Sequence, residues 1–271
     1  MKQFLIPLLI ALLLPIAGYA QEDSDPFALI QQGQRQVERG QLQAALITFK
    51  KAIELDPRNG MAVNAAAQVA SFLELPADSA FYYTAYLFLE AEYMGDAENV
   101  RKALDKQASL IANGATLKAD MLPDDGEIMV NGVPLGRGKF SLPAQSGKAY
   151  EIEVNVEDYQ PYKETVILQP GEVKTLAIRL KKIIYFGKVK LKVLPREDVK
   201  VYVDTKYVGT SLEEVETVEG KRLICFEKEG FDRWWRYVNV PRNDTYGLDV
   251  MLRNQSRPDG KCGVWPEEEG Y

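Results

Sequence analysis

The side chains that most often carry enzyme chemistry are scarce in this sequence. Its 271 residues include no histidine and only two cysteines, Cys225 and Cys262. Without histidine, a Ser-His-Asp or Cys-His nucleophile, a histidine proton shuttle and a histidine-ligated zinc ion are excluded. The carboxylates of Asp124, Asp125 and Glu267–Glu269 do not have the spacing of a calcium loop, and no phosphate-binding loop is present. The sequence therefore predicts a protein that is not an enzyme and has no catalytic residue, metal ion or cofactor.

Composition and charge point to a globular protein with no affinity for nucleic acid. Apolar residues make up 46% of the chain, and 33 basic against 39 acidic residues give a net charge of −6. A mildly acidic chain gives no reason to expect nucleic acid or an anionic membrane as a partner. The length accommodates roughly two to three domains of about 100–150 residues each.

The first twenty residues have the pattern of a secretory signal peptide. Lys2 precedes the apolar run Phe4–Ile16, and Gly18 and Ala20 place small residues at −3 and −1 of a cleavage site. The alternative is a membrane anchor, but the run is shorter than the ~20 residues that a spanning helix needs. We expect residues 1–20 to be removed, no other stretch to span a membrane, and the protein to be exported to the periplasm or the outer surface.

An exported location favours a disulfide between the two cysteines, since disulfides persist in oxidising compartments. Cys225 alternates with Ile224 and Phe226, which should face the core, so Cys225 should point to the other face of its strand. Cys262 lies in a C-terminal tail, residues 254–271. An intrachain bridge between the cysteines would attach this tail to the last β domain. The alternatives are two free thiols or an intermolecular link through Cys262.

Residues 23–113 have the apolar periodicity of helices, and their spacing resembles a tetratricopeptide (TPR) repeat. The matching positions are Leu29, Gly33, Gly40, Ala45, Phe49, Ala52 and Pro57. Small residues at 33 and 45 would allow two helices to approach closely, and Pro57 would end the second helix. A degenerate second copy runs from Asn59 to Glu92. The segment 81–93 is so apolar that its helix should bury more than one face.

From Ala115 onward the apolar period changes to two, which is typical of half-buried antiparallel strands. The pattern occurs twice, over residues 115–182 and 183–253. Pro195 follows Pro123 by 72 residues, and Gly209 follows Gly136 by 73. Each copy contains about six short strands, which suits a small sandwich. The predicted fold is α+β and multidomain, with TPR-like helical hairpins followed by two small antiparallel β-sandwiches.

Four short motifs in each copy resemble the PEGA domain family. The family is named for a Pro-Glu-Gly-Ala turn, and Pro123–Gly126 and Pro195–Asp198 stand at that turn. At the Asp-Gly pair that follows in the family stand Asn131-Gly132 and Asp204-Thr205, and at its Gly-Thr-Pro turn stand Gly136 and Gly209-Thr210. At the Gly-Tyr pair near the end of the domain stand Glu157–Tyr159 and Glu229–Phe231. The resemblance implies a non-catalytic β-sandwich found in bacterial envelope and surface proteins. It implies no agreed ligand or catalytic residue.

Two surfaces are candidates for binding. In a TPR-like module the first helix of each pair lines the concave face, which assigns a polar partner groove to Gln34, Glu38, Asn64, Gln68 and Ser71. The alternative is that this face packs on the first β domain or on a second copy of the chain.

The second candidate is an aromatic platform formed by Trp235 and Tyr237. Adjacent strand residues face opposite sides, so Trp234 should enter the core while Trp235 and Tyr237 share the outer face. Such a pair could stack on a sugar ring or anchor a protein. The alternative is that the tail covers it, for example with Trp265.

These features predict a non-enzymatic adaptor or scaffold of the bacterial cell envelope. Its expected partner is another envelope protein or a peptide bound through the TPR-like module, with the PEGA-like domains as envelope-binding or spacer units. One alternative is a module that binds carbohydrate or peptidoglycan through the aromatic platform. Another is a structural homo-oligomer built through the helical half.

Overall fold

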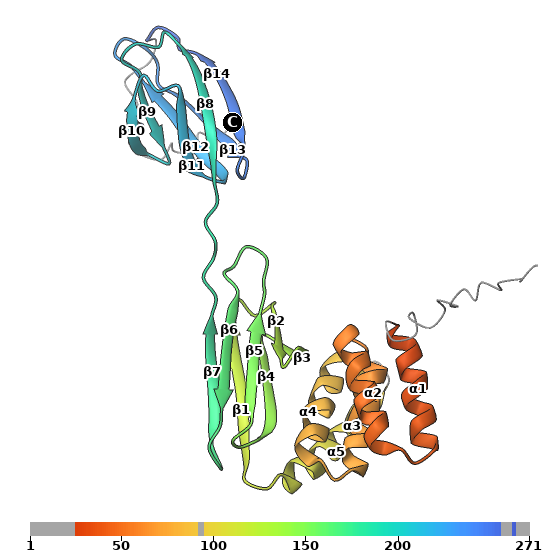
Figure 1. Cartoon of the computed structure of the whole chain (residues 1–271). Coiled ribbons are helices and arrows are strands. Elements are labelled where there is room, and N and C mark those ends of the chain that lie inside the picture. The colour runs from red at the N-terminus through yellow and green to blue at the C-terminus, as the bar shows by residue number, and fades with distance from the viewer. Residues whose placement is uncertain (1–24, 92–94, 256–261, 264–271) are drawn as a thin grey trace, which may run out of the picture. The chain divides into compact units, whose positions relative to one another are not determined.

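The computed structural model describes residues 25–91, 95–255 and 262–263 (Figure 1). The chain divides into two compact units, Met1–Lys181 and Lys182–Tyr271. The predicted signal peptide and most of the predicted tail lie outside the described residues. Across the described ranges, no helix has both the length and the apolar character needed to cross a membrane.

The first unit begins with a stack of helices. They are α1 (Pro26–Glu38), α2 (Leu42–Leu55), α3 (Gly60–Phe72), α4 (Pro76–Tyr86), the π-helix η2 (Leu87–Ala91) and α5 (Ala97–Leu110). Side-chain oxygens of Asp25 and Asn59 accept hydrogen bonds from the first turns of α1 and α3, and Pro76 occupies the first turn of α4. Short connections make successive helices antiparallel neighbours.

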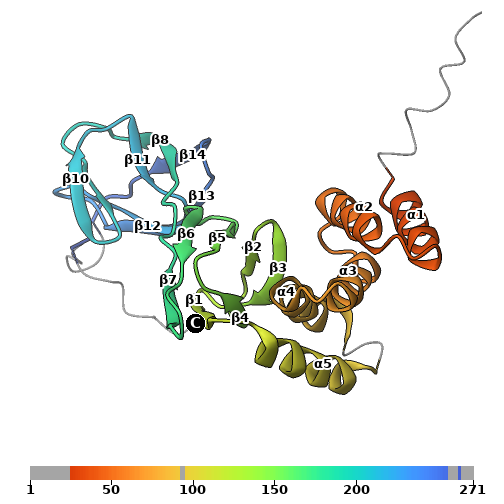
Figure 2. The same ribbon diagram turned by 60° about the horizontal axis from the view of Figure 1, so that its bottom comes forward.

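Helix α4 is buried on several faces, as its apolar sequence predicted. Every residue from Ser79 to Tyr86 is buried. On one side α4 packs against α3, and on the other it contacts strands β3 (Val133–Arg137) and β4 (Lys139–Gln145), beside which it lies in Figure 2. Helices and strands of the first unit consequently share one hydrophobic core.

The β half of the first unit is a single seven-stranded sheet with the order β6-β5-β2-β3-β4-β1-β7. The remaining strands are β1 (Gly114–Leu122), β2 (Glu127–Val130), β5 (Ala149–Val154), β6 (Tyr162–Ile167) and β7 (Val173–Arg179). One residue pair, Arg137 with Lys139, joins β3 to β4 across the turn at Gly138. The sheet is therefore continuous only through this hairpin.

The second unit has two sheets that enclose one core. A four-stranded sheet has the order β10-β9-β12-β13, and a three-stranded sheet has the order β11-β8-β14. Both contribute to the same buried apolar cluster, in a sandwich-like arrangement. The strands are β8 (Phe186–Leu194), β9 (Lys200–Val203), β10 (Lys206–Thr210), β11 (Glu214–Val218), β12 (Gly220–Glu227), β13 (Trp234–Val240) and β14 (Thr245–Met251).

The two β modules repeat the same plan. The sequence β3-β2-β5-β6 in the first module corresponds to β10-β9-β12-β13 in the second, and β4-β1-β7 corresponds to β11-β8-β14. The peptide bonds before Pro123 and Pro195 are cis in both. The side chains of Asn131 and Asp204 accept equivalent hydrogen bonds from the backbones of Glu151 and Leu223, at 2.8 and 2.9 Å.

The strand pairing differs from the antiparallel prediction at one place in each module. The first and last strands are parallel, with Thr116 opposite Val173 in β1 and β7, and Thr245 opposite Lys188 in β14 and β8. Each module also has seven strands, one more than the six expected. Alternation of apolar and polar residues specifies which face of a strand is buried, but not its direction or neighbour.

Candidate functional site

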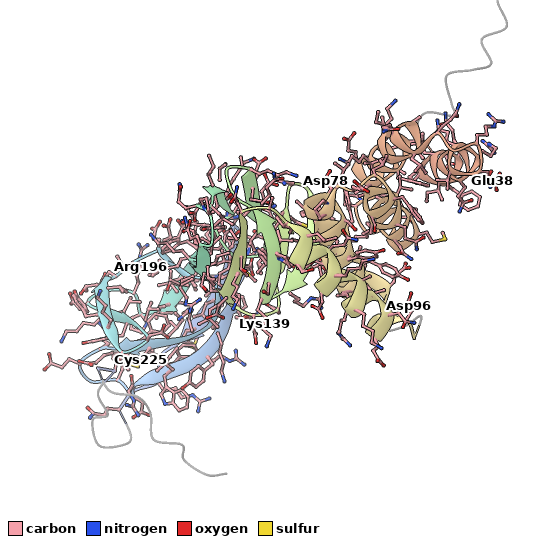
Figure 3. All side chains as sticks on the ribbon, turned by 90° about the horizontal axis from the view of Figure 1, so that it is seen from below. Glu38, Asp78, Asp96, Lys139, Arg196 and Cys225 are labelled. Carbon is pink, nitrogen blue, oxygen red and sulfur yellow. A yellow bond between two sulfur atoms is a disulfide. The ribbon has the colours of Figure 1, made fainter. Side chains whose placement is uncertain are left out.

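A groove of about 470 Å³ lies on the helical stack between α1 and α3. Four of the five residues predicted for it line it, namely Gln34 and Glu38 from α1 and Asn64 and Gln68 from α3. Ser71 does not line it, because its hydroxyl accepts a hydrogen bond of 2.7 Å from the side chain of Gln107 on α5. The groove side chains of α1 include Glu38, labelled in Figure 3.

The close approach of α1 and α2 sets the floor of this groove. A Cβ atom at Gly33 would stand only 2.5 Å from the ring of Phe49, so the ring can lie against α1 only because residue 33 is glycine. Phe49 is 1% exposed and contributes to the groove lining. The small residue that suggested a helical hairpin in the sequence therefore also shapes the groove.

The groove combines carboxamides with exposed apolar side chains. The side chain of Gln68 donates a hydrogen bond of 3.1 Å to the side chain of Asn64, which orders these two carboxamides of the groove. Met61 and Phe72, which sequence reasoning missed, line the same groove and are 55% and 71% exposed. Their spacing of eleven residues, three turns of helix, was the available signal, because apolar residues on a polar helix face indicate a contact surface.

A different surface of the helices meets the strands of the first unit. Asp78, at the start of α4, forms ion pairs of 2.9 Å with Lys50 on α2 and with Lys148 in the β4–β5 turn. Arg58 reaches Glu127 on β2 at 2.5 Å. Figure 3 shows Asp78 at this boundary. The groove residues take no part in these contacts.

Electrostatic interactions make Asp78 the anchor of that boundary. Burial alone would raise the pKa of its carboxyl group, but hydrogen bonds from Lys148 and Lys50, together with their positive charges, outweigh it and lower the pKa. Asp78 therefore stays ionised, and its charge is matched from both the helices and the strands.

In the second unit the paired tryptophans occupy opposite faces of β13. Trp234 faces the core and stacks on Phe226, with ring centroids 5.2 Å apart. Trp235 and Tyr237 lie on the outer face and are 38% and 42% exposed. Their rings are 6.2 Å apart and nearly perpendicular, at 83°. The Nζ of Lys221 lies 4.4 Å from the centre of the Tyr237 ring.

A disulfide joins Cys225 to Cys262 beside these rings. Cys225 lies directly opposite Trp235 on β13 and Tyr202 on β9. It occupies the face opposite to Ile224, as expected, yet it is only 2% exposed. The face turned away from the core is thus dry at its centre. Trp265, suggested as a cover for Trp235, lies outside the described residues.

The described ranges contain no cluster of three or more His, Cys, Asp or Glu side chains that could hold a metal ion.

Comparison with known proteins finds a family match for one part of the chain. Residues 116–184 match the PEGA domain family. No curated protein matches the sequence. Among solved structures, the TIE protein of Bacillus anthracis is 15% identical with a TM-score of 0.31, over 52% of this chain and 34% of that chain. The minor pilin GBS52 of Streptococcus agalactiae is 8% identical with a TM-score of 0.26, over 54% of this chain and 98% of the pilin. The chain thus corresponds to about a third of the length of the TIE protein.

Proposed function

We propose that this chain is an exported, non-enzymatic adaptor of the bacterial cell envelope, and that the groove between α1 and α3 binds a segment of another envelope protein. In this proposal the helices are a TPR-like module and residues 183–253 form a second PEGA domain. The observation that carries the proposal is the groove itself, where ordered carboxamides lie beside exposed apolar side chains.

The groove chemistry suits an extended peptide. A carboxamide both donates and accepts hydrogen bonds, so Gln34, Asn64 and Gln68 can pair with the backbone amides of a bound segment. Met61 and Phe72 offer apolar contact for one of its side chains. Glu38 favours a basic residue in the segment, since opposite charges attract across a partly desolvated surface.

The rest of the first unit supports the groove without obstructing it. The ion pairs of Asp78 and Arg58 attach the helices to the strands through α2, α4 and the α2–α3 connection. A binding surface carried on packed elements loses little conformational entropy when a partner binds. The β modules then serve as spacers or as envelope-binding units.

Site-directed photo-crosslinking in the native cell tests the groove. A photoreactive residue at Asn64 should give a crosslinked product with a defined envelope protein, whereas the same residue at Lys51, exposed on α2 and outside the groove lining, should not. Gln68→Ala combined with Phe72→Ala should reduce the Asn64 product at least tenfold. Equal products from Asn64 and Lys51, or none from Asn64, would contradict the proposal.

The absence of catalysis is part of the proposal and has its own test. A hydrolytic or transfer activity of the purified protein that disappears when a single carboxylate is replaced would show that the chain is an enzyme.

A further inference from the structure

The two β modules provide an internal comparison of one surface. Val130 pairs with Ile152 in the first module, and Val203 pairs with Ile224 at the same place in the second. All four side chains are buried. With the cores aligned in this way, the residues on the outer face of β5–β6 can be compared directly with those on β12–β13.

In the first module the outer positions form an ion-paired, solvated face. Lys163 on β6 pairs with Glu151 and Glu153 on β5. Hydrogen bonds to these two carboxylates raise the pKa of the lysine. Thr165 stands opposite Glu151. Charged side chains on an outer sheet face keep it in water and prevent association.

In the second module the same positions are aromatic or apolar. The register places Leu223 and Cys225 where Glu151 and Glu153 stand, and Trp235 and Tyr237 where Lys163 and Thr165 stand. The exchange removes three charges from one face of an otherwise equivalent module. The core does not require it, because that face points away from the core.

The exposed part of this face is chemically mixed. The ring of Trp235 lies beside the hydroxyl-bearing ring of Tyr237, and the ammonium of Lys221 covers Tyr237. Within the described part of the chain, no carboxylate forms a salt bridge with Lys221, so its charge can meet an anion from outside. Leu223 on the same face is 1% exposed and offers no aliphatic contact to a partner.

A sugar ring matches this surface. The C–H groups on one face of a pyranose carry partial positive charge and fit the negative face of an indole, while its hydroxyl groups need polar neighbours. Because the two rings are nearly perpendicular, they form a corner around one sugar rather than a flat floor for several. Since the ammonium already covers Tyr237, Trp235 is the ring that can stack.

We infer that the outer face of the four-stranded sheet in the second unit is a binding site for a glycan that carries carboxylates, with Trp235 stacking on a sugar ring and Lys221 pairing with a carboxylate. The buried disulfide between Cys225 and Cys262 belongs to the same face, where Cys225 lies directly opposite Trp235. This site is separate from the α1–α3 groove, so either can fail without the other.

Binding of the full chain to two insoluble polymers tests the inference. Peptidoglycan carries carboxylates, and chitin has a similar β-linked N-acetylated backbone without them. The unmodified protein should bind both, with peptidoglycan binding the tighter and weakening as salt is added. Trp235→Ala should reduce binding to both about tenfold, while Trp235→Phe should retain part of it. Lys221→Gln should reduce peptidoglycan binding about threefold and leave chitin binding unchanged.

The first module supplies the matched control. Lys163→Ala changes the residue equivalent to Trp235 and should leave binding to both polymers unchanged. Circular dichroism of each variant establishes that it is folded. If Trp235→Ala does not fold, the indole N–H resonances of the unmodified protein should shift when soluble chito-oligosaccharide is added, and unchanged spectra would overturn the inference.

Three results would reject this site. One is equal retention of the unmodified protein and folded Trp235→Ala. Another is that neither polymer retains the protein. If Trp235→Ala then dissociates an oligomer, the face is a contact between copies of the chain. The third is an unchanged affinity of Lys221→Gln for peptidoglycan, which would show that Lys221 does not recognise a carboxylate of the ligand.

Discussion

At the scale of single residues, the two repeated turns place different amino acids in the same left-handed backbone conformation. Residues 132 and 205 both adopt positive φ, at 76° and 69°, in the turn that follows β2 or β9. Residue 132 is glycine, which reaches this region without strain, whereas residue 205 is a β-branched threonine. The second module therefore carries a local strain that the first does not.

Exchanging these residues should move the stabilities of the two modules in opposite directions. Thr205→Gly should raise the free energy of unfolding of the second unit by about 1 kcal/mol, because glycine removes the Cβ clash of the left-handed conformation. Gly132→Thr should lower the stability of the first by a similar amount. Urea unfolding measures both changes. A less stable Thr205→Gly protein would refute the assignment of strain to residue 205.

Residue identity predicted these turns because turn chemistry is local. Asn131-Gly132 and Asp204-Thr205 could be located from composition and spacing alone. The burial of Cys225 could not, because alternation gives only the face on which a side chain lies. Whether that face is wet depends on neighbours from β9, β13 and residue 262, which are far apart in the sequence.

At the scale of elements, Asp78 connects three pieces of the first unit through one carboxylate. Its partners come from α2 and from the β4–β5 turn, and it lies in the first turn of α4, where the helix dipole also favours a negative charge. The depressed pKa means that folding stabilises the ionised form of the Asp78 carboxyl group relative to its protonated form.

Asp78→Asn should lower the free energy of unfolding by about 1 kcal/mol at pH 7, a modest value because both lysine partners are partly exposed. Since the folded pKa is depressed, the contribution is fully present above the unfolded carboxyl pKa of about 4 and is lost as the pH falls through the lower folded value. The stabilities of Asp78→Asn and of the unmodified protein should therefore approach each other as the pH falls, and denaturant unfolding from pH 7 to pH 2 measures this difference.

The matched control for Asp78 is Asp120→Asn, which removes a more exposed pair with Arg179 and should change stability by less than about 0.5 kcal/mol. A difference between Asp78→Asn and the unmodified protein that persists undiminished at pH 2 would contradict the electrostatic explanation.

Element positions were more predictable than element partners. Apolar periodicity located the helices and the many-sided burial of α4, since each signal lies within one segment. The contact of α4 with β3 and β4 and the parallel pairing of β1 with β7 depend on tertiary packing, which no local pattern encodes.

At the scale of the whole molecule, the disulfide belongs to the second unit alone. It closes a loop across a separation of 37 residues, which in the chain-entropy model corresponds to roughly 3–4 kcal/mol. The first unit contains no cysteine and is stabilised by its shared helix–strand core. Oxidation state should therefore affect the two units unequally.

Calorimetry of the protein with and without reductant should reveal that inequality. The unfolding transition of the second unit should move to lower temperature on reduction by roughly 10 °C or more, while that of the first stays in place. Replacing both cysteines by serine should reproduce the shift without reductant. Equal shifts of both transitions would mean that the units do not unfold separately.

The parallel pairing of the first and last strands has a mechanical consequence. Because β1 and β7 run in the same direction, as do β8 and β14, the chain enters each module at one end of that strand pair and leaves at the other. Tension along the chain would load all the hydrogen bonds of the pair in shear at once, instead of opening them one after another. Both modules are thus arranged to resist stretching.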